Sequence, residues 1–204
     1  SGVPDFLADA VLAKKELVIR YNVSTGCRFS RKPASLGGLE GLEELLGERA
    51  PDKVLPVLER LLFTRKNVAL VMEYAEVVAP AADTSFSSEQ DRQSLVTLQR
   101  WSMAPQLEAS DNLVILLSEV PSELHPKIVA NPRVAAVSLP MPTREERRQV
   151  VEHVNAALEP AWVDRLADVT AGLKAVQIAG ILRPPPAAAE DPAARLAFIQ
   201  GLVG

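Results

Sequence analysis

Residues Asn67–Met72 read NVALVM, an unbroken apolar run between two stretches with helical spacing. Residues 112–117, NLVILL, repeat this pattern further along the chain. Apolar residues at every position, rather than at every second one, are typical of a strand in a parallel sheet that helices cover on both faces. The sequence therefore predicts an α/β fold with a doubly wound sheet. Its predicted parallel strands are Leu17–Val23, Val68–Met72, Leu113–Leu117 and Val134–Leu139.

Helical patterns occupy the segments between these strands. Asp52 is expected to cap a helix that continues to Phe63. Ser87 and Gln90 have the spacing of a capping box, which predicts a further helix up to about Met103. Leu36–Leu46 also has helical spacing, although three glycines weaken it. These helices would cover the sheet.

The pattern changes at Thr143, after which no strand is predicted. Thr143 and Glu146 form a second capping box, and amphipathic helical segments follow as far as Leu182. The proline- and alanine-rich residues 184–194 are typical of a semi-rigid linker, and Arg195–Val203 has a short amphipathic pattern. The sequence therefore predicts a core domain over residues 1–142, a helical lid over 143–183, and a linker with a short C-terminal helix over 184–204.

Composition excludes several classes of protein. The 204 residues carry 22 basic and 26 acidic side chains, and 48% of them are hydrophobic, so a disordered chain is not expected and nucleic-acid binding is disfavoured. A single cysteine excludes an internal disulfide, and two histidines that lie far apart do not predict a metal site. No apolar run is long enough to span a membrane, and the first residues do not resemble a signal peptide. We expect a cytoplasmic protein with no membrane partner.

Three stretches resemble the AAA+ ATPase family. Lys66–Val78, KNVALVMEYAEVV, resembles the strand that ends in the Walker B acids. Asp111–Val154 resembles the strand with the sensor residue, the next helix and the step into the lid. Leu166–Leu182, LADVTAGLKAVQIAGIL, is similar to the family's lid segment. Because they occur in the family's order and at its spacings, the resemblance implies a P-loop-NTPase-like sheet followed by a small helical lid.

The chain departs from this family at the phosphate-binding loop. That loop needs the pattern G-x-x-x-x-G-K-[ST], whose backbone amides surround the phosphates while its lysine neutralises their charge. No Gly-Lys dipeptide occurs in the sequence. The segment after the first strand, YNVSTGCRFSRKPASLGG, offers Gly26 and a misplaced Lys32 instead. The sequence therefore predicts a degenerate Walker A region without a phosphate site.

The resemblance also suggests three candidate site residues. Glu73 follows Met72 where the family has Asp-Glu, so it is either a retained catalytic glutamate or a polar residue at a strand end. Ser118 stands at the position of the sensor residue and is a candidate for nucleotide binding. Arg133 stands where an arginine finger contacts the neighbouring subunit's γ-phosphate, or else is a surface arginine after Asn-Pro. No metal ligand is predicted.

Within the AAA+ family, the chain resembles the degenerate N-terminal domain of two-part ATPases of the plastid and cyanobacterial type. This implies a non-hydrolysing domain of a larger AAA+ ATPase, acting in assembly, regulation or client binding. Its expected partners are a downstream AAA+ domain of the same chain that uses ATP and Mg²⁺, further copies in a ring, and a protein client. No cofactor is expected in this domain itself. The alternative is a weakly active ATP-binding domain with an atypical phosphate loop at Ser24–Gly38.

Overall fold

The computed structural model describes residues 2–33, 45–82, 87–155, 158–183, 197–198 and 201. It divides into two compact units, Ser1–Ala136 and Val137–Gly204, and each is described here by itself. Most of the predicted helix Leu36–Leu46 lies outside the described residues. The predicted linker over 184–194 and most of the predicted helix Arg195–Val203 also lie outside them.

The first unit is built on a sheet that has four strands within the described residues, in the order β2-β1-β3-β4. These strands are β1 (Leu17–Asn22), β2 (Gly26–Arg31), β3 (Val68–Glu73) and β4 (Leu113–Leu117). Strands β1, β3 and β4 are parallel, whereas β2 returns antiparallel to β1. The α/β fold is therefore confirmed, with a mixed sheet that is mostly parallel.

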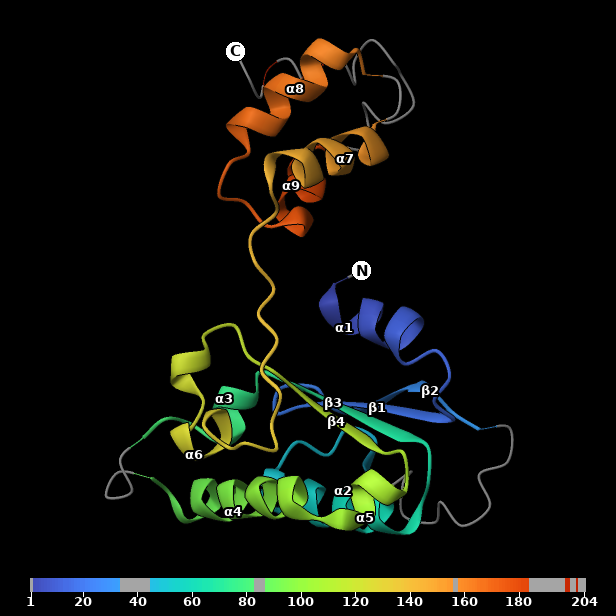
Figure 1. Ribbon diagram of the computed structural model, residues 1–204, viewed down its shortest axis with the longest axis vertical. Helices are drawn as coiled ribbons and strands as arrows, with labels where there is room; N and C mark the ends of the chain where they lie inside the picture. The colour runs from blue at the N-terminus through green and yellow to red at the C-terminus, as the bar shows by residue number, and fades with distance from the viewer. Residues whose placement is uncertain are drawn as a thin grey trace. The chain divides into compact units, whose positions relative to one another are not determined.

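Helices cover both faces of this sheet (Figure 1). On one face lie α1 (Val3–Phe6) and the π-helical turn Leu7–Val11, and on the other lie α2 (Pro51–Thr64), α4 (Glu89–Met103) and α5 (Pro105–Ala109). Every residue of β3 is buried, as expected for a strand between two helical layers. Short helical segments, α3 (Ala75–Val78), a 3₁₀ turn (Pro121–Glu123) and α6 (Pro126–Val129), follow β3 and β4.

Two strand assignments differ from the sequence prediction. Val134–Leu139 is not a strand: it forms no ladder, and Val137 and Leu139 are 83% and 69% exposed. The prediction was wrong because an apolar pattern shows that a segment suits a sheet but not that a neighbouring strand is present. Conversely, β2 was missed because its sequence, GCRFSR, mixes apolar and charged residues. It pairs with β1 because a turn at residues 23–25 folds the chain back.

Two helix starts also differ from the prediction. Helix α2 is capped by Ala50, and Asp52 lies in its first turn, because Pro51 already occupies the first helical position. Helix α4 is capped by Ser88 rather than Ser87. The Ser88 hydroxyl accepts from the amide of Asp91 at 3.1 Å, and the Asp91 carboxylate accepts from the amide of Ser88 at 2.9 Å. The carboxylate of Asp91, three residues after the cap, completes this reciprocal pair, so the helix begins one residue later than predicted.

The second unit is helical in its described part. Its helices are α7 (Arg144–Val154), α8 (Pro160–Val169) and α9 (Ala175–Ile181). They pack around a separate core of Val151, Val163, Leu166, Ile178 and Leu182. The predicted capping box at Thr143 is present, since its hydroxyl accepts from the amide of Glu146 at 3.3 Å. Among the described residues, no helix is both long and apolar enough to cross a membrane.

Candidate functional site

The carboxyl ends of the parallel strands carry two of the three predicted site residues, Glu73 and Ser118. Ligands of open α/β sheets bind at this edge, because the loops that leave the strands meet there. Glu73 is the last residue of β3 and pairs in register with Leu117, the last residue of β4, so Ser118 directly follows this pair. Tyr74, directly after Glu73, has a left-handed φ of 56°. A bulky residue in this conformation is unusual, so the chain turns sharply immediately after the carboxylate.

Glu73 is 8% exposed, and both of its carboxylate oxygens have partners on the first hairpin. Oε1 accepts a hydrogen bond from Nε of Arg20 at 2.5 Å. Oε2 accepts from Nδ2 of Asn22 at 3.2 Å and lies 3.6 Å from Nη2 of Arg28. A buried carboxylate is strongly unfavourable unless it is paired, and here two guanidinium groups supply the opposite charge.

Arg20 extends the cluster to the N-terminal helix. Its Nη1 lies 2.6 Å from Oδ1 of Asp5 in α1. Burial acts to lower the pKa of Arg20, but the hydrogen bonds and charges of Glu73 and Asp5 outweigh it and raise that pKa. The pKa of Asp5 is lowered, first by the hydrogen bond from the amide of Gly2 and then by Arg20. Arg20 therefore bridges two carboxylates and ties α1 to the sheet.

Asn22 is oriented by the turn that follows β1. Its Oδ1 accepts hydrogen bonds from the amides of Ser24 and Thr25, at 3.0 and 2.8 Å, and from the Thr25 hydroxyl at 3.0 Å. Such a turn is typical of asparagine. Because the oxygen is engaged with the turn, the amide nitrogen faces Glu73.

Gly26 directly follows the same turn as the first residue of β2, and its conformation explains why a glycine stands there. Its φ is 74°, and a Cβ atom would lie 2.6 Å from backbone atoms of Gly47 and Glu48. Gly26 therefore allows close packing of two backbone segments. The first part of the Ser24–Gly38 segment is this turn and β2, while residues 34–38 lie outside the described residues.

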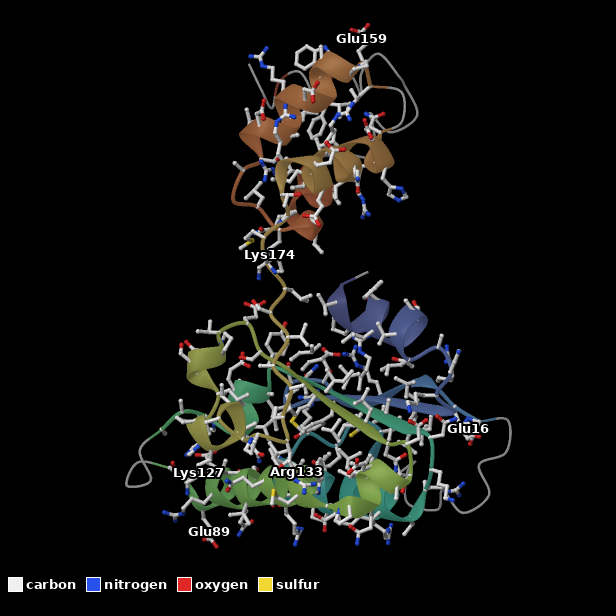
Figure 2. The ribbon with its side chains drawn as sticks, in the orientation of Figure 1. Glu16, Glu89, Lys127, Arg133, Glu159 and Lys174 are labelled. Carbon is white, nitrogen blue, oxygen red and sulfur yellow. The ribbon has the colours of Figure 1, made fainter. Side chains whose placement is uncertain are left out.

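The other predicted residues do not join the Glu73 cluster. The Ser118 hydroxyl donates to the carbonyl of Val120 at 3.1 Å. Arg133 is exposed, and its amide donates to Oδ1 of Asn131, whose Nδ2 donates to Ser102 of α4 at 2.7 Å. Figure 2 labels Arg133 beside α4. The structure thus brings Glu73 and Ser118 to one edge of the sheet and places Arg133 by the helical layer.

Arg20, Arg28, Asn22 and Asp5 were missed by sequence reasoning. Arg20 gave a signal, because a single charged residue inside the apolar run LVIRYNV requires a buried partner of opposite charge. The identity of that partner depends on strand order. Arg20 aligns with Val71 in the ladder, and Glu73 stands two residues further along β3 on the same face. Nothing in the sequence indicates that order.

The cluster is a poor site for magnesium. Within the described part of the chain, no group of three or more His, Cys, Asp or Glu residues is placed to hold a metal ion. A divalent cation at Glu73 would have to displace Arg20 or Arg28 from a carboxylate that they already neutralise. The residues present therefore do not fit a Mg²⁺–nucleotide complex at this position.

Comparison with known proteins identifies relatives of this architecture. The model of the family described as "AAA+ chaperone, N-terminal Rossmann-like domain" matches residues 1–140. A chain of the solved E. coli MS115-1 HORMA:CdnC:Trip13 complex is similar in fold, with a TM-score of 0.54 and 17% sequence identity. That alignment covers 74% of this chain and 55% of the other, so this chain spans about half the length of that relative. The search of curated proteins found no match.

Proposed function

Because this chain belongs to the family of AAA+ chaperone N-terminal Rossmann-like domains, we propose that it is a non-hydrolysing module of a larger AAA+ ATPase. Its role would be in assembly, regulation or client binding. The observation that carries the proposal is the engagement of Glu73, at the Walker B position, by the guanidinium groups of Arg20 and Arg28.

Hydrolysis of a nucleotide depends on parts that this site lacks or uses otherwise. Phosphoryl transfer needs a cradle of amides and a lysine for the phosphates, a carboxylate for Mg²⁺, and a residue that positions the attacking water. The sequence has no Gly-Lys dipeptide, and Gly26 packs against the backbone of Gly47 and Glu48. Glu73 has no oxygen without a partner with which to orient water or metal. These observations favour a structural role for Glu73.

The proposed partners follow from the family and not from a contact in this structure. A downstream AAA+ domain of the same chain would bind ATP and Mg²⁺, and copies of the full protein would assemble into a ring. Arg133 would lie near the junction between subunits, where an exposed cation has room to contact a neighbour. The fold relative was solved within a complex of HORMA, CdnC and Trip13 proteins, which supports a role in protein–protein contacts. We expect the protein to act in the cytoplasm.

Calorimetric titration of this chain with ATP and Mg²⁺ tests the proposal. We expect no binding, or a dissociation constant weaker than about 100 μM, which corresponds to about 5.5 kcal/mol. Tighter binding would instead support the alternative of a weakly active ATP-binding domain. An Arg20→Met variant serves as the matched comparison, because it releases Glu73 from its closest cation. If that variant gains Mg²⁺ binding while the parent has none, Arg20 is what excludes the metal.

The role of Glu73 is tested separately in the longer protein. A Glu73→Gln variant should keep the ATPase rate of the parent, since a glutamine still accepts the Arg20 hydrogen bond. A loss of rate of tenfold or more, with the fold intact, would show that Glu73 is catalytic. An Arg133→Ala variant should weaken ring assembly, which light scattering with and without ATP measures.

A further inference from the structure

The outer edge of β4 is the least protected part of the sheet. Within the described residues, β4 is an edge strand that pairs with β3 alone. Its sequence, LVILL, is apolar at every position, yet Leu113 is 41% exposed and the other four residues are only half-buried. The neighbouring β3, which has a similar composition, is completely buried. The sequence of β4 is thus that of an interior strand at an edge position.

The opposite edge shows how this sheet protects a strand that remains at the edge. Strand β2 carries Arg28 and Arg31, and its pairing with β1 contains an irregularity between Val18 and Ile19. The Arg31 guanidinium donates to the carbonyl of Leu12 at 3.0 Å, which ties this edge to the N-terminal segment. Charges and bulges of this kind prevent edge-to-edge pairing in natural sheets. Strand β4 has neither.

Both layers of the core end at β4. Val114 and Leu116 pack on the core that includes α2 and α4, while Ile115 and Leu117 pack on the core beneath α1. A strand added at this edge would continue both layers. It would therefore need apolar residues at consecutive positions. Alternating apolar and polar residues would instead suit a strand with one solvent-exposed face.

Acidic residues stand at both ends of β4. The side chain of Asp111 is 83% exposed, although Oδ2 lies 2.8 Å from Nζ of Lys15, and Glu119 is exposed beyond the other end. If two copies of β4 paired antiparallel about Ile115, Asp111 of each copy would face Glu119 of the other. Like charges directly opposite each other are destabilising. The charges thus disfavour a second copy and favour a strand flanked by basic residues.

We propose that the β4 edge binds, by strand addition, an extended segment of another polypeptide that has consecutive apolar residues between basic flanks. Backbone hydrogen bonds to β4 would provide affinity, and Asp111 and Glu119 would select the flanks. This interaction does not involve nucleotide, so it is independent of the proposed loss of hydrolysis.

A synthetic peptide tests this proposal on the intact chain. Its centre holds five β-branched apolar residues and its ends hold pairs of lysines, and a fluorescent label reports binding by anisotropy. We expect binding that slows amide exchange at residues 113–117. A peptide with proline at its centre should not bind, because proline cannot complete the ladder. A peptide with glutamates in place of the lysines should bind more weakly.

Charge variants of the protein give the matched control. Asp111→Asn combined with Glu119→Gln should weaken binding about threefold to tenfold, because exposed ion pairs each contribute modestly. Asparagine suits the left-handed φ of 52° at position 111. Glu16→Gln removes an exposed acid from the same end of the sheet, beside β1, and should leave the affinity unchanged (Figure 2).

Four results would overturn the proposal. They are an absence of binding at millimolar peptide, protection of amides other than those of β4, protection of β4 in the free chain, and protection that appears only as the chain self-associates. The third result would assign the edge to another segment of this chain, and the fourth to a second copy. None of them depends on the ATP titration, so failure of either proposal is recognised separately.

Discussion

Replacing Arg20 with methionine is expected to destabilise the first unit by about 3 kcal/mol. Methionine keeps much of the apolar stem of arginine but removes the guanidinium group. The side chains of Arg20 and Glu73 are 16% and 10% exposed, so the Glu73 carboxylate would remain in a largely buried position. Its remaining partners would be Asn22 at 3.2 Å and Arg28 at 3.6 Å.

The size of this effect follows from the burial of the pair. Removing one partner of a buried ion pair costs about 3–5 kcal/mol, because the other charge is left without compensation. Arg28 still faces Glu73, which places the expected loss at the lower end of this range. The double variant Arg20→Met/Glu73→Leu removes both buried charges, and an apolar replacement of a buried pair is often neutral or stabilising. We therefore expect the double variant to lie within about 1 kcal/mol of the parent.

Urea unfolding followed by tryptophan fluorescence measures both variants. Trp101 is 2% exposed in the first unit, whereas Trp162 belongs to the second. A Trp162→Phe background therefore lets the signal report on the unit that contains Arg20. The shift in midpoint at an unchanged slope gives the change in the free energy of unfolding.

The reasoning would be refuted by a loss below about 1 kcal/mol for Arg20→Met, the level of a solvated surface pair. It would also be refuted if the double variant were less stable than Arg20→Met alone. The latter result would show that the carboxylate stabilises the fold without its arginine partner.

Three further predictions concern the sheet, the turn and the N-terminal helix. Leu70→Asp should abolish soluble expression, because Leu70 in β3 is 0% exposed and the new charge would be fully buried. Ile115→Asp should give soluble protein, because Ile115 lies half-buried in the edge strand β4. Gly26→Ala should lower the melting temperature, because φ is 74° and the new Cβ would lie 2.6 Å from backbone atoms. Gly47→Ala should lower it less, because Gly47 shares the positive φ but a Cβ there would have no atom within 4 Å. The lowered pKa of Asp5 means that its ion pair stabilises the fold above about pH 4 and is lost as pH falls through that lowered pKa. The melting temperature of Asp5→Asn should therefore lie below the parent's at pH 7 and approach it near pH 3.

Strands β3 and β4 could be predicted from sequence because apolar residues at consecutive positions mark a strand that lies between two helical layers. Val68–Met72 and Leu113–Leu117 are apolar at every position, and both are strands in the structure. The same criterion failed at Val134–Leu139, which is apolar at five of its six positions but forms no ladder. Burial and pairing are separate conditions, and only the first has a local signature. Strand β2 shows the reverse case, because its pairing is set by the Gly26 turn rather than by composition.

The candidate site could be located from sequence only in part. The position of Glu73 at a strand end was predicted, whereas its place near Ser118 follows only from the register of β3 with β4. The role of Glu73 depends on contacts with Arg20, Asn22 and Arg28, which all come from the first hairpin. These partners precede Glu73 by 53, 51 and 45 positions in the sequence. Such contacts arise from strand order and from a turn that fixes one side-chain amide. A motif search reports the carboxylate but not its partners.

The charge balance of the cluster gives a structural reason for the buried acid at position 73. Asp5 and Glu73 contribute two negative charges, and Arg20 and Arg28 contribute two positive ones, so the group is neutral without any ligand. A site for Mg²⁺ and a polyphosphate needs the opposite arrangement, in which carboxylates await a metal and cations await phosphates. Here the protein's own side chains provide both the negative and the positive charges. The arginines therefore offset the desolvation cost of Glu73 within the fold. In the structural role proposed for it, Glu73 pairs with Arg20 at the junction of β1, β3 and α1. This role requires Arg20. A glutamate at position 73 is compatible with both a structural and a catalytic acid, so the stability of the Arg20 variants is the measurement that tests the structural role.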